Sequence, residues 1–259
     1  MGANTSRFTT LHFHQNGSSP LDAATQDAST IEFRIFAQTR DPDLVRPDMP
    51  QAFNRWCLEV FLQCAPGLSL SNDLRQVVPK PYYEYWVSLL PQAELALRLH
   101  AMWSGGQTTT ELGPPSLTRE YPRQQPSYET EAPVSLDVFG ATVRAPLGYI
   151  VAGRSGDKAS DCNCGFFVRH DDEWDWLRSF LTVDRMKRLL GEREYKGGLI
   201  DRFELRGIRA VHFLLRDHLD RGYNACKTYD TLGKSKIYTP LFFSVFLLFF
   251  MESDGYSVC

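Results

Sequence analysis

The chain has 259 residues, of which 43% are hydrophobic and 23% charged, as is ordinary for one large or two small globular domains. This composition argues against disorder over most of the chain. The formal net charge is only −3, so the protein lacks the strong basic field that attracts nucleic acid or an anionic membrane surface.

The first part of the chain alternates between strand-like and helix-like patterns of apolar residues. Residues 8–13 and 31–35 predict strands, the second because apolar and charged side chains alternate there. A helix is expected between Pro50 and Pro66, where apolar residues recur every three or four positions. Residues 95–112 predict a β-hairpin that turns at a Ser-Gly-Gly sequence.

A change of composition follows the hairpin. Residues 113–134 contain five prolines among polar residues, and this density blocks both helices and central strands. The segment therefore predicts an extended linker. We expect four parts, at residues 1–112, 113–144 (the linker), 145–234 and 235–259 (an atypical hydrophobic tail).

The third part mixes short strands and helices. Strands are expected at residues 147–152, 164–168 and 202–205, with a weaker strand at 226–229, and helices at 171–190 and 211–218. Gly191 is expected just past the end of the first helical stretch. The order strand, strand, helix, strand, helix, strand is typical of a small α+β sandwich.

The polar segment from Arg154 to Lys158 separates two of these predicted strands. A tight turn there, with Gly156 at positive φ, would point successive N–H groups at one anion, and Lys158 would add positive charge. Asp157 and Lys158 are the candidate catalytic pair. The candidate substrate-binding residues are Arg154, Ser155, Gly156, Asn163 and His212. The alternative interpretation is a plain hairpin turn with solvated charges.

Metal and cofactor motifs are weak. Cys162 and Cys164 offer two soft ligands, but their spacing fits no standard zinc site, and no metal site is predicted. The sequence contains neither a glycine-rich nucleotide loop nor a nucleophile elbow, so the cofactor is unknown. The six irregularly spaced cysteines indicate reduced thiols in the cytoplasm.

Several segments are similar to one known family. In the third part these are Ala152–Lys158 and residues 163, 165–169, 176–178, 202–205, 210–215, 217–222 and 232–234; earlier in the chain they are residues 35–38, 79–81, 89–92 and 121–126. Through them residues 145–233 resemble the C-terminal ferredoxin-like domain of the acyclic terpene utilisation (AtuA-like) proteins. Residues 8–128 resemble the end of the larger domain that precedes it.

The resemblance implies an α+β chain, in which the end of an α/β domain is followed by a small ferredoxin-like α+β sandwich. It also implies an enzyme or enzyme component of isoprenoid or secondary-metabolite metabolism, encoded in a gene cluster. The expected substrate is a small acid or an acyl-CoA-type molecule. A homo-oligomer is a further expectation, and no nucleic-acid partner is expected.

Two departures from the family leave alternatives open. Ala159 stands where relatives usually carry glycine, which costs energy if the position needs positive φ. The hydrophobic tail after Lys234, together with the missing region before residue 8, suggests a truncated reading frame. A non-catalytic remnant or interaction module is therefore an alternative, as is a tail-anchored protein. The uncharged run of residues 237–251 falls short of the ~20 residues of a membrane-spanning helix, so no stable insertion is expected.

Overall fold

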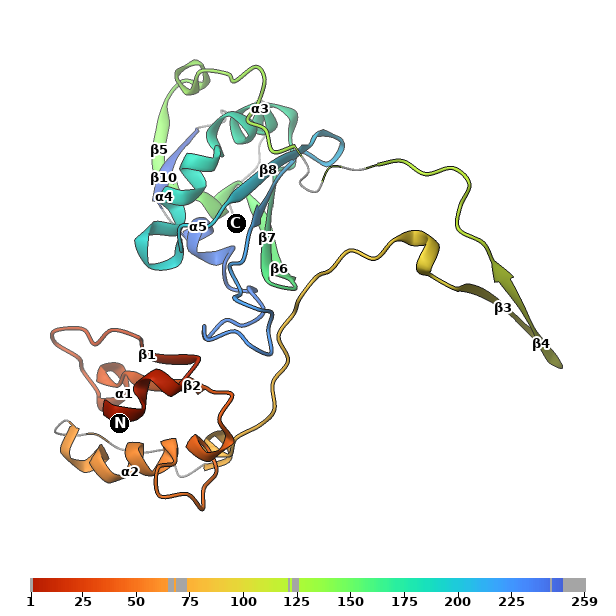
Figure 1. Cartoon of the computed structure of the whole chain (residues 1–259). Helices are drawn as coiled ribbons and strands as arrows, with labels where there is room; N and C mark the ends of the chain where they lie inside the picture. Colours follow the sequence, from red (N-terminus) through yellow and green to blue (C-terminus); the bar gives the residue numbers. More distant parts are fainter. Residues whose placement is uncertain are drawn as a thin grey trace. The chain divides into compact units, whose positions relative to one another are not determined.

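The structure is a computed structural model that describes residues 2–64, 68, 74–120, 122, 126–242 and 244–248 (Figure 1). Its contacts divide the chain into two compact units. One consists of Met1–Tyr83 with Lys227–Tyr229, and the other of Glu84–Cys226 with Asp230–Cys259.

The first unit is built around a two-stranded antiparallel ribbon. Strand β1 (Thr10–Asn16) pairs with β2 (Glu32–Gln38). Helix α1 (Gln26–Ser29) is a single turn in the connection, and α2 (Phe53–Cys64) follows after a short 3-10 helix at Pro42–Leu44. The buried ring of Phe8 packs edge-on against Phe53 and Trp56. Both predicted strands and the predicted helix are confirmed.

The second unit begins with a hairpin. Strands β3 (Leu97–Trp103) and β4 (Gly106–Leu112) pair antiparallel over their whole length. The predicted hairpin is thus confirmed, including its turn. The described residues between β4 and a 3-10 helix at Leu136–Phe139 form neither helix nor strand, as the proline content of this segment predicts.

A four-stranded antiparallel sheet forms the centre of the second unit. Its order is β6-β7-β9-β8, with β6 at Ala152–Lys158, β7 at Asp161–Phe167, β8 at Ile200–Leu205 and β9 at Ala210–Leu215. Helices α3 (Asp171–Phe180) and α4 (Val183–Glu194) lie on one side of it (Figure 1). The core is formed where alternate strand residues such as Phe166 and Phe213 meet Trp176, Leu177 and Met186 of these helices.

The last described residues also belong to this unit. Strand β5 (Thr142–Pro146) pairs antiparallel with β10 (Ser244–Leu248), and α5 (Tyr238–Phe242) precedes β10. Ile237 is only 2% exposed and is part of the core, and Lys236 is buried beside Glu194 in an ion pair. The start of the segment expected as an atypical tail therefore packs into the fold.

Several local predictions are wrong. Residues 147–149 form a 3-10 helix instead of a strand, and the expected polar turn at 153–162 is mostly strand β6. Residues 211–215 form strand β9 instead of a helix. The apolar residues at 211, 214 and 215 fit a helical period, but those at 211, 213 and 215 also fit the alternation of a strand. The segment forms a strand because this second set is buried between the sheet and the helices.

The mixed α+β class is confirmed, with the order strand, strand, helix, helix, strand, strand in the main sheet unit. No strand forms at residues 226–229. Gly191 has a φ of +68° and interrupts α4 where the helix was expected to end. No disulfide joins the cysteines that the structure describes, and none of its described helices has both the length and the apolarity to cross a bilayer.

Candidate functional site

The register of the main sheet determines which candidate residues share a face. Arg154 pairs with Gly165, and Gly156 pairs with Asn163. His212 of β9 lies opposite Gly165 and also opposite Phe203 of β8. Paired residues of an antiparallel sheet point to the same side. That side is opposite the helices, and we call it the open face; it carries Arg154, Gly156, Lys158, Asp161, Asn163, Gly165, Asp201, Phe203, His212 and Leu214, and the carboxylates of Asp161 and Asp201 are both paired to Arg216.

Two lysine ammonium groups lie on the open face, that of Lys158 beside Asn163 and that of Lys234 beside Gly156. Lys158 Nζ donates hydrogen bonds to Asn163 Oδ1 at 3.4 Å and to the carbonyl oxygen of Asp157 at 2.9 Å. A Cβ atom built on Gly156 would lie 3.0 Å from Lys234 Nζ and 3.6 Å from Asn163 Oδ1. The missing side chain of Gly156 therefore leaves room for the ammonium group of Lys234 beside the amide of Asn163.

Lys234 is brought to this position by a loop that is tied to β6. The carboxylate of Asp230 accepts hydrogen bonds from the N–H groups of Lys234 and Ser235, at 3.0 and 2.7 Å. Ser155 Oγ donates to the carbonyl oxygen of Lys234 at 2.9 Å and accepts from the N–H of Ile237 at 3.2 Å. Ser155 is 4% exposed, so its hydroxyl serves the loop that carries Lys234.

His212 borders the cationic cluster. A Cβ atom on Gly165 would lie 3.4 Å from His212 Nδ1, so the imidazole leans over β7. Partial burial of the ring, and to a smaller degree the positive charge of Lys158, lower the pKa of His212. The imidazole is thus neutral at pH 7, and an anion bound nearby would raise its pKa again.

The structure brings together five of the seven predicted site residues: Arg154, Gly156, Lys158, Asn163 and His212 share the open face. The expected turn with convergent N–H groups is wrong, because residues 152–158 are extended and the chain reverses only at Ala159, with φ +59°. Strand alternation puts Ser155 and Asp157 on the helix-covered side. Asp157 therefore points away from the ligand position over Gly156, and its role as a base stays a prediction.

Sequence reasoning missed Lys234 as a site residue. It lies far along the chain from Arg154–Lys158, as the last residue of the domain expected at 145–234. The local signal is the run Asp230-Thr231-Leu232-Gly233 before it, in which the Asp side chain caps the following turn and Gly233 has a φ of +62°.

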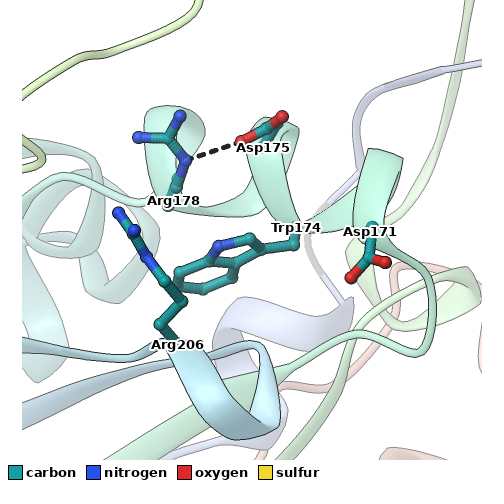
Figure 2. Close-up of a pocket in the computed structure, with 5 residues that line it drawn as sticks. All are labelled: Asp171, Trp174, Asp175, Arg178 and Arg206. Carbon is teal, nitrogen blue, oxygen red and sulfur yellow. Dashed lines mark hydrogen bonds and ion pairs between the residues drawn. The ribbon is translucent and has the colours of Figure 1, made fainter.

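A separate pocket of about 360 Å³ lies beside the first turns of α3 (Figure 2). Trp174 forms one wall, and Asp171, Asp175, Arg178 and Arg206 line the rest. Its charges are largely neutralised internally, since Arg178 pairs with Asp175 at 2.8 Å and Asp171 pairs with Arg209. None of the predicted site residues lines this pocket, so the open face is the better candidate.

The Cys-x-Cys sequence faces the core. Cys162 and Cys164 are both fully buried, and their side chains lie on the helix-covered side of β7. The hydrogen bond with Cys162 and burial raise the pKa of Cys164 well above its usual range. Within the described part of the chain, no three His, Cys, Asp or Glu side chains gather in a way that would hold a metal ion.

Comparison with known families finds two matches. Residues 1–101 match the family model described as "Acyclic terpene utilisation family protein AtuA", and residues 145–244 match the "AtuA ferredoxin-like domain". The second match includes Lys234 and runs through α5, ten residues beyond the boundary expected at 234. No curated protein and no solved structure matches the chain.

Proposed function

We propose that this chain, which belongs to the acyclic terpene utilisation (AtuA) family, is an enzyme or enzyme component of isoprenoid or secondary-metabolite metabolism that binds an acidic substrate on its open face. The acidic group is a carboxylate, or a phosphate of an acyl-CoA-type molecule. Lys158 and Lys234 hold it over Gly156, with Asn163 and His212 beside them.

The single observation behind this proposal is that Lys158 Nζ donates to Asn163 Oδ1 while Lys234 Nζ lies beside Gly156, the residue paired with Asn163. Among the residues that the structure describes, no carboxylate forms an ion pair with either lysine. Like charges held close together repel, and an anion between them replaces that repulsion with two attractions. Charge-assisted hydrogen bonds from lysine to carboxylate or phosphate are also about twice as strong as neutral ones.

The alternative is a module of the same family that binds the acid without converting it. Burial lowers the pKa of His212 on the open face, and the predicted base Asp157 lies on the other side of the sheet. A turnover assay on the intact protein decides between the two, since a binding module retains acid binding and yields no product.

Acetate tests the head-group site. Titration of the folded chain, followed by NMR, should shift the Asn163 side-chain amide and raise the pKa of His212, because a bound anion favours the imidazolium. Lys158→Ala and Lys234→Ala should each weaken acetate binding about tenfold, the effect of removing one hydrogen bond to a charged group.

Lys187→Ala is the matched control, because Lys187 is a partly exposed lysine on α4, away from the open face. It should leave acetate binding unchanged. Equal affinity of the wild type, Lys158→Ala and Lys234→Ala for acetate would refute the site.

A further inference from the structure

The pocket beside α3 holds a second, independent candidate site (Figure 2). Trp174 lines it and is only 6% exposed, yet its indole N–H has no hydrogen-bond acceptor among the described residues. The nitrogen is not fully enclosed by protein atoms either. Buried tryptophan N–H groups usually have a partner, and the pocket is the place from which an acceptor can reach this one.

Arg206 adds a positive charge to the same pocket. It lies alongside the indole, in the short 3-10 helix after β8, and its guanidinium has no ion-pair or hydrogen-bond partner within the described part of the chain (Figure 2). Arg178, in contrast, is held by Asp175 at 2.8 Å, Thr130 Oγ1 at 2.8 Å and the carbonyl oxygen of Ala132 at 2.9 Å. The indole N–H and the Arg206 guanidinium are therefore the donors that the pocket offers to an acidic group.

The pocket also offers negative charge, from the first turns of α3. Asp171 and Asp175 are four residues apart and so lie on one face of the helix. Each gives one carboxylate oxygen to an arginine, Asp175 to Arg178 and Asp171 to Arg209, and the second oxygen of each has no donor among the residues described. Their side chains are 87% exposed at Asp171 and 50% at Asp175, so these acceptors remain available to a cationic group.

We infer that this pocket binds a small zwitterion of the amino-acid type, which carries a carboxylate and an ammonium group on a short chain. Its carboxylate lies on Arg206 and the Trp174 N–H, and its ammonium group on the aspartates of α3. Figure 2 shows Arg206 and Asp171 on opposite sides of the indole, so opposite charges stand at the two ends of the site. The volume of about 360 Å³ is near the lower end for small-molecule sites and suits a ligand of this size.

The two signs of charge make the pocket selective. A simple acid bound at Arg206 meets the carboxylates of Asp171 and Asp175, and a simple amine bound at these carboxylates meets the arginines. A zwitterion sets an opposite charge against each group, so it gains two attractions where a singly charged ligand gains one attraction and one repulsion. Preference for a zwitterion is thus the property that identifies this site.

Three ligands with chains of the same length test this preference: γ-aminobutyrate, butyrate and butylammonium. The readout is the NMR resonance of the Trp174 indole N–H in the folded full chain, because a carboxylate on the open face does not contact it. γ-Aminobutyrate should shift this resonance and bind at least about tenfold more tightly than either of the others, the effect of one more hydrogen bond to a charged group. Lys158→Ala, on the open face, should leave this binding unchanged.

Two substitutions probe the two ends of the pocket. Arg206→Gln should weaken γ-aminobutyrate binding about tenfold, since it removes the partner of the carboxylate. Asp175→Asn removes a negative charge and leaves that of Arg178 unbalanced, so it should reduce the preference for γ-aminobutyrate over butyrate about tenfold. Arg188→Gln is the matched control for both, because Arg188 is an exposed arginine of α4 outside the pocket.

Three results would overturn the inference. They are an indole N–H resonance that does not respond to γ-aminobutyrate, butyrate that binds as tightly as γ-aminobutyrate, and Arg206→Gln with wild-type affinity. Each of them leaves the proposed function standing, because the acetate test of the open face follows Asn163 and His212 instead of Trp174.

Discussion

Ala159 is the residue at which the chain reverses between β6 and β7. Its φ of +59° lies in the left-handed region, where the Cβ atom of an L-residue crowds the following carbonyl group at a cost of about 1–2 kcal/mol. Glycine carries no such cost. The family resemblance implies glycine at this position, and the positive φ of Ala159 is the physical reason for that expectation.

Ala159→Gly should therefore raise the free energy of unfolding by about 1 kcal/mol, less the entropy that glycine adds to the unfolded chain. Urea unfolding measures the change. Ala152→Gly is the control, since Ala152 is exposed in the extended part of the same strand and glycine there should lower stability by roughly 0.5–1 kcal/mol. A loss of stability in both variants would contradict the assignment of strain to Ala159.

His218, after the end of β9, is a second residue that should measurably lower the free energy of unfolding, in this case at acidic pH. The side chain is 4% exposed, and its pKa is lowered to about 4, first by burial and then by the charges of Lys196 and Lys236, which outweigh Glu194 and Asp220. An unfolded histidine takes up its proton near pH 6.5. The unfolded state thus binds the proton first as the pH falls.

Stability should consequently be intact above pH 6.5 and decrease as the pH falls from 6.5 to 4, with His218 accounting for up to about 3 kcal/mol. His218→Gln, which does not titrate, should lose less stability over this interval in urea unfolding at pH 7, 5 and 4. His100→Gln, on the exposed β3, should keep the wild-type slope. The same slope in all three proteins would exclude His218 as the source.

At the scale of elements, Arg202 joins three segments to one another. Its guanidinium is fully buried on β8 and donates to the carbonyl oxygens of Leu181 at 2.7 Å, Arg178 at 2.8 Å and Tyr128 at 3.0 Å. Two of these acceptors end helix α3, whose last carbonyl groups have no partner within the helix. A carboxylate oxygen of Glu204 at 3.0 Å balances the charge.

Arg202→Lys should lower the free energy of unfolding by at least about 3 kcal/mol, because an ammonium group cannot reach these separate acceptors and leaves buried polar groups without partners. Thermal or urea unfolding measures this loss. Arg206→Lys, at an exposed arginine just after β8, should change stability by less than about 0.5 kcal/mol. Similar losses for both substitutions would show that the guanidinium of Arg202 has no special role.

The elements also show where sequence patterns stop being informative. Helix α3 and strand β8 were predictable because each has one apolar and one polar side. The residues Arg154–Lys158 predict a turn because they are polar throughout, yet they belong to strand β6. On the helix-covered side of β6, the hydroxyl of Ser155 forms its hydrogen bonds with the loop that carries Lys234. The other side of the strand belongs to the open face. Neither condition can be read from residues 152–158 alone.

At the scale of the whole molecule, the resemblance predicted the family and the ferredoxin-like domain, and both are confirmed by the family matches. For the candidate site, the sequence predicted most of the residues but not their arrangement in space. Five residues could be named because they lie near one another in sequence or in the family motif. Three others come from distant parts of the chain: the loop carries Lys234, the sheet register places Phe203, and the proline-rich segment brings Tyr128 against Phe203.

The proline-rich segment also affects how copies of the chain can meet. On the outer side of β8, the N–H groups of Arg202 and Glu204 and their carbonyl oxygens are all engaged by Ser127 and Tyr128. A strand from a neighbouring molecule finds no unpaired ladder there, so the sheet cannot grow sideways into a continuous ribbon at this edge. Cleaving the chain within residues 113–126 would loosen this cover, expose the edge of β8 and so favour association with a strand of another molecule.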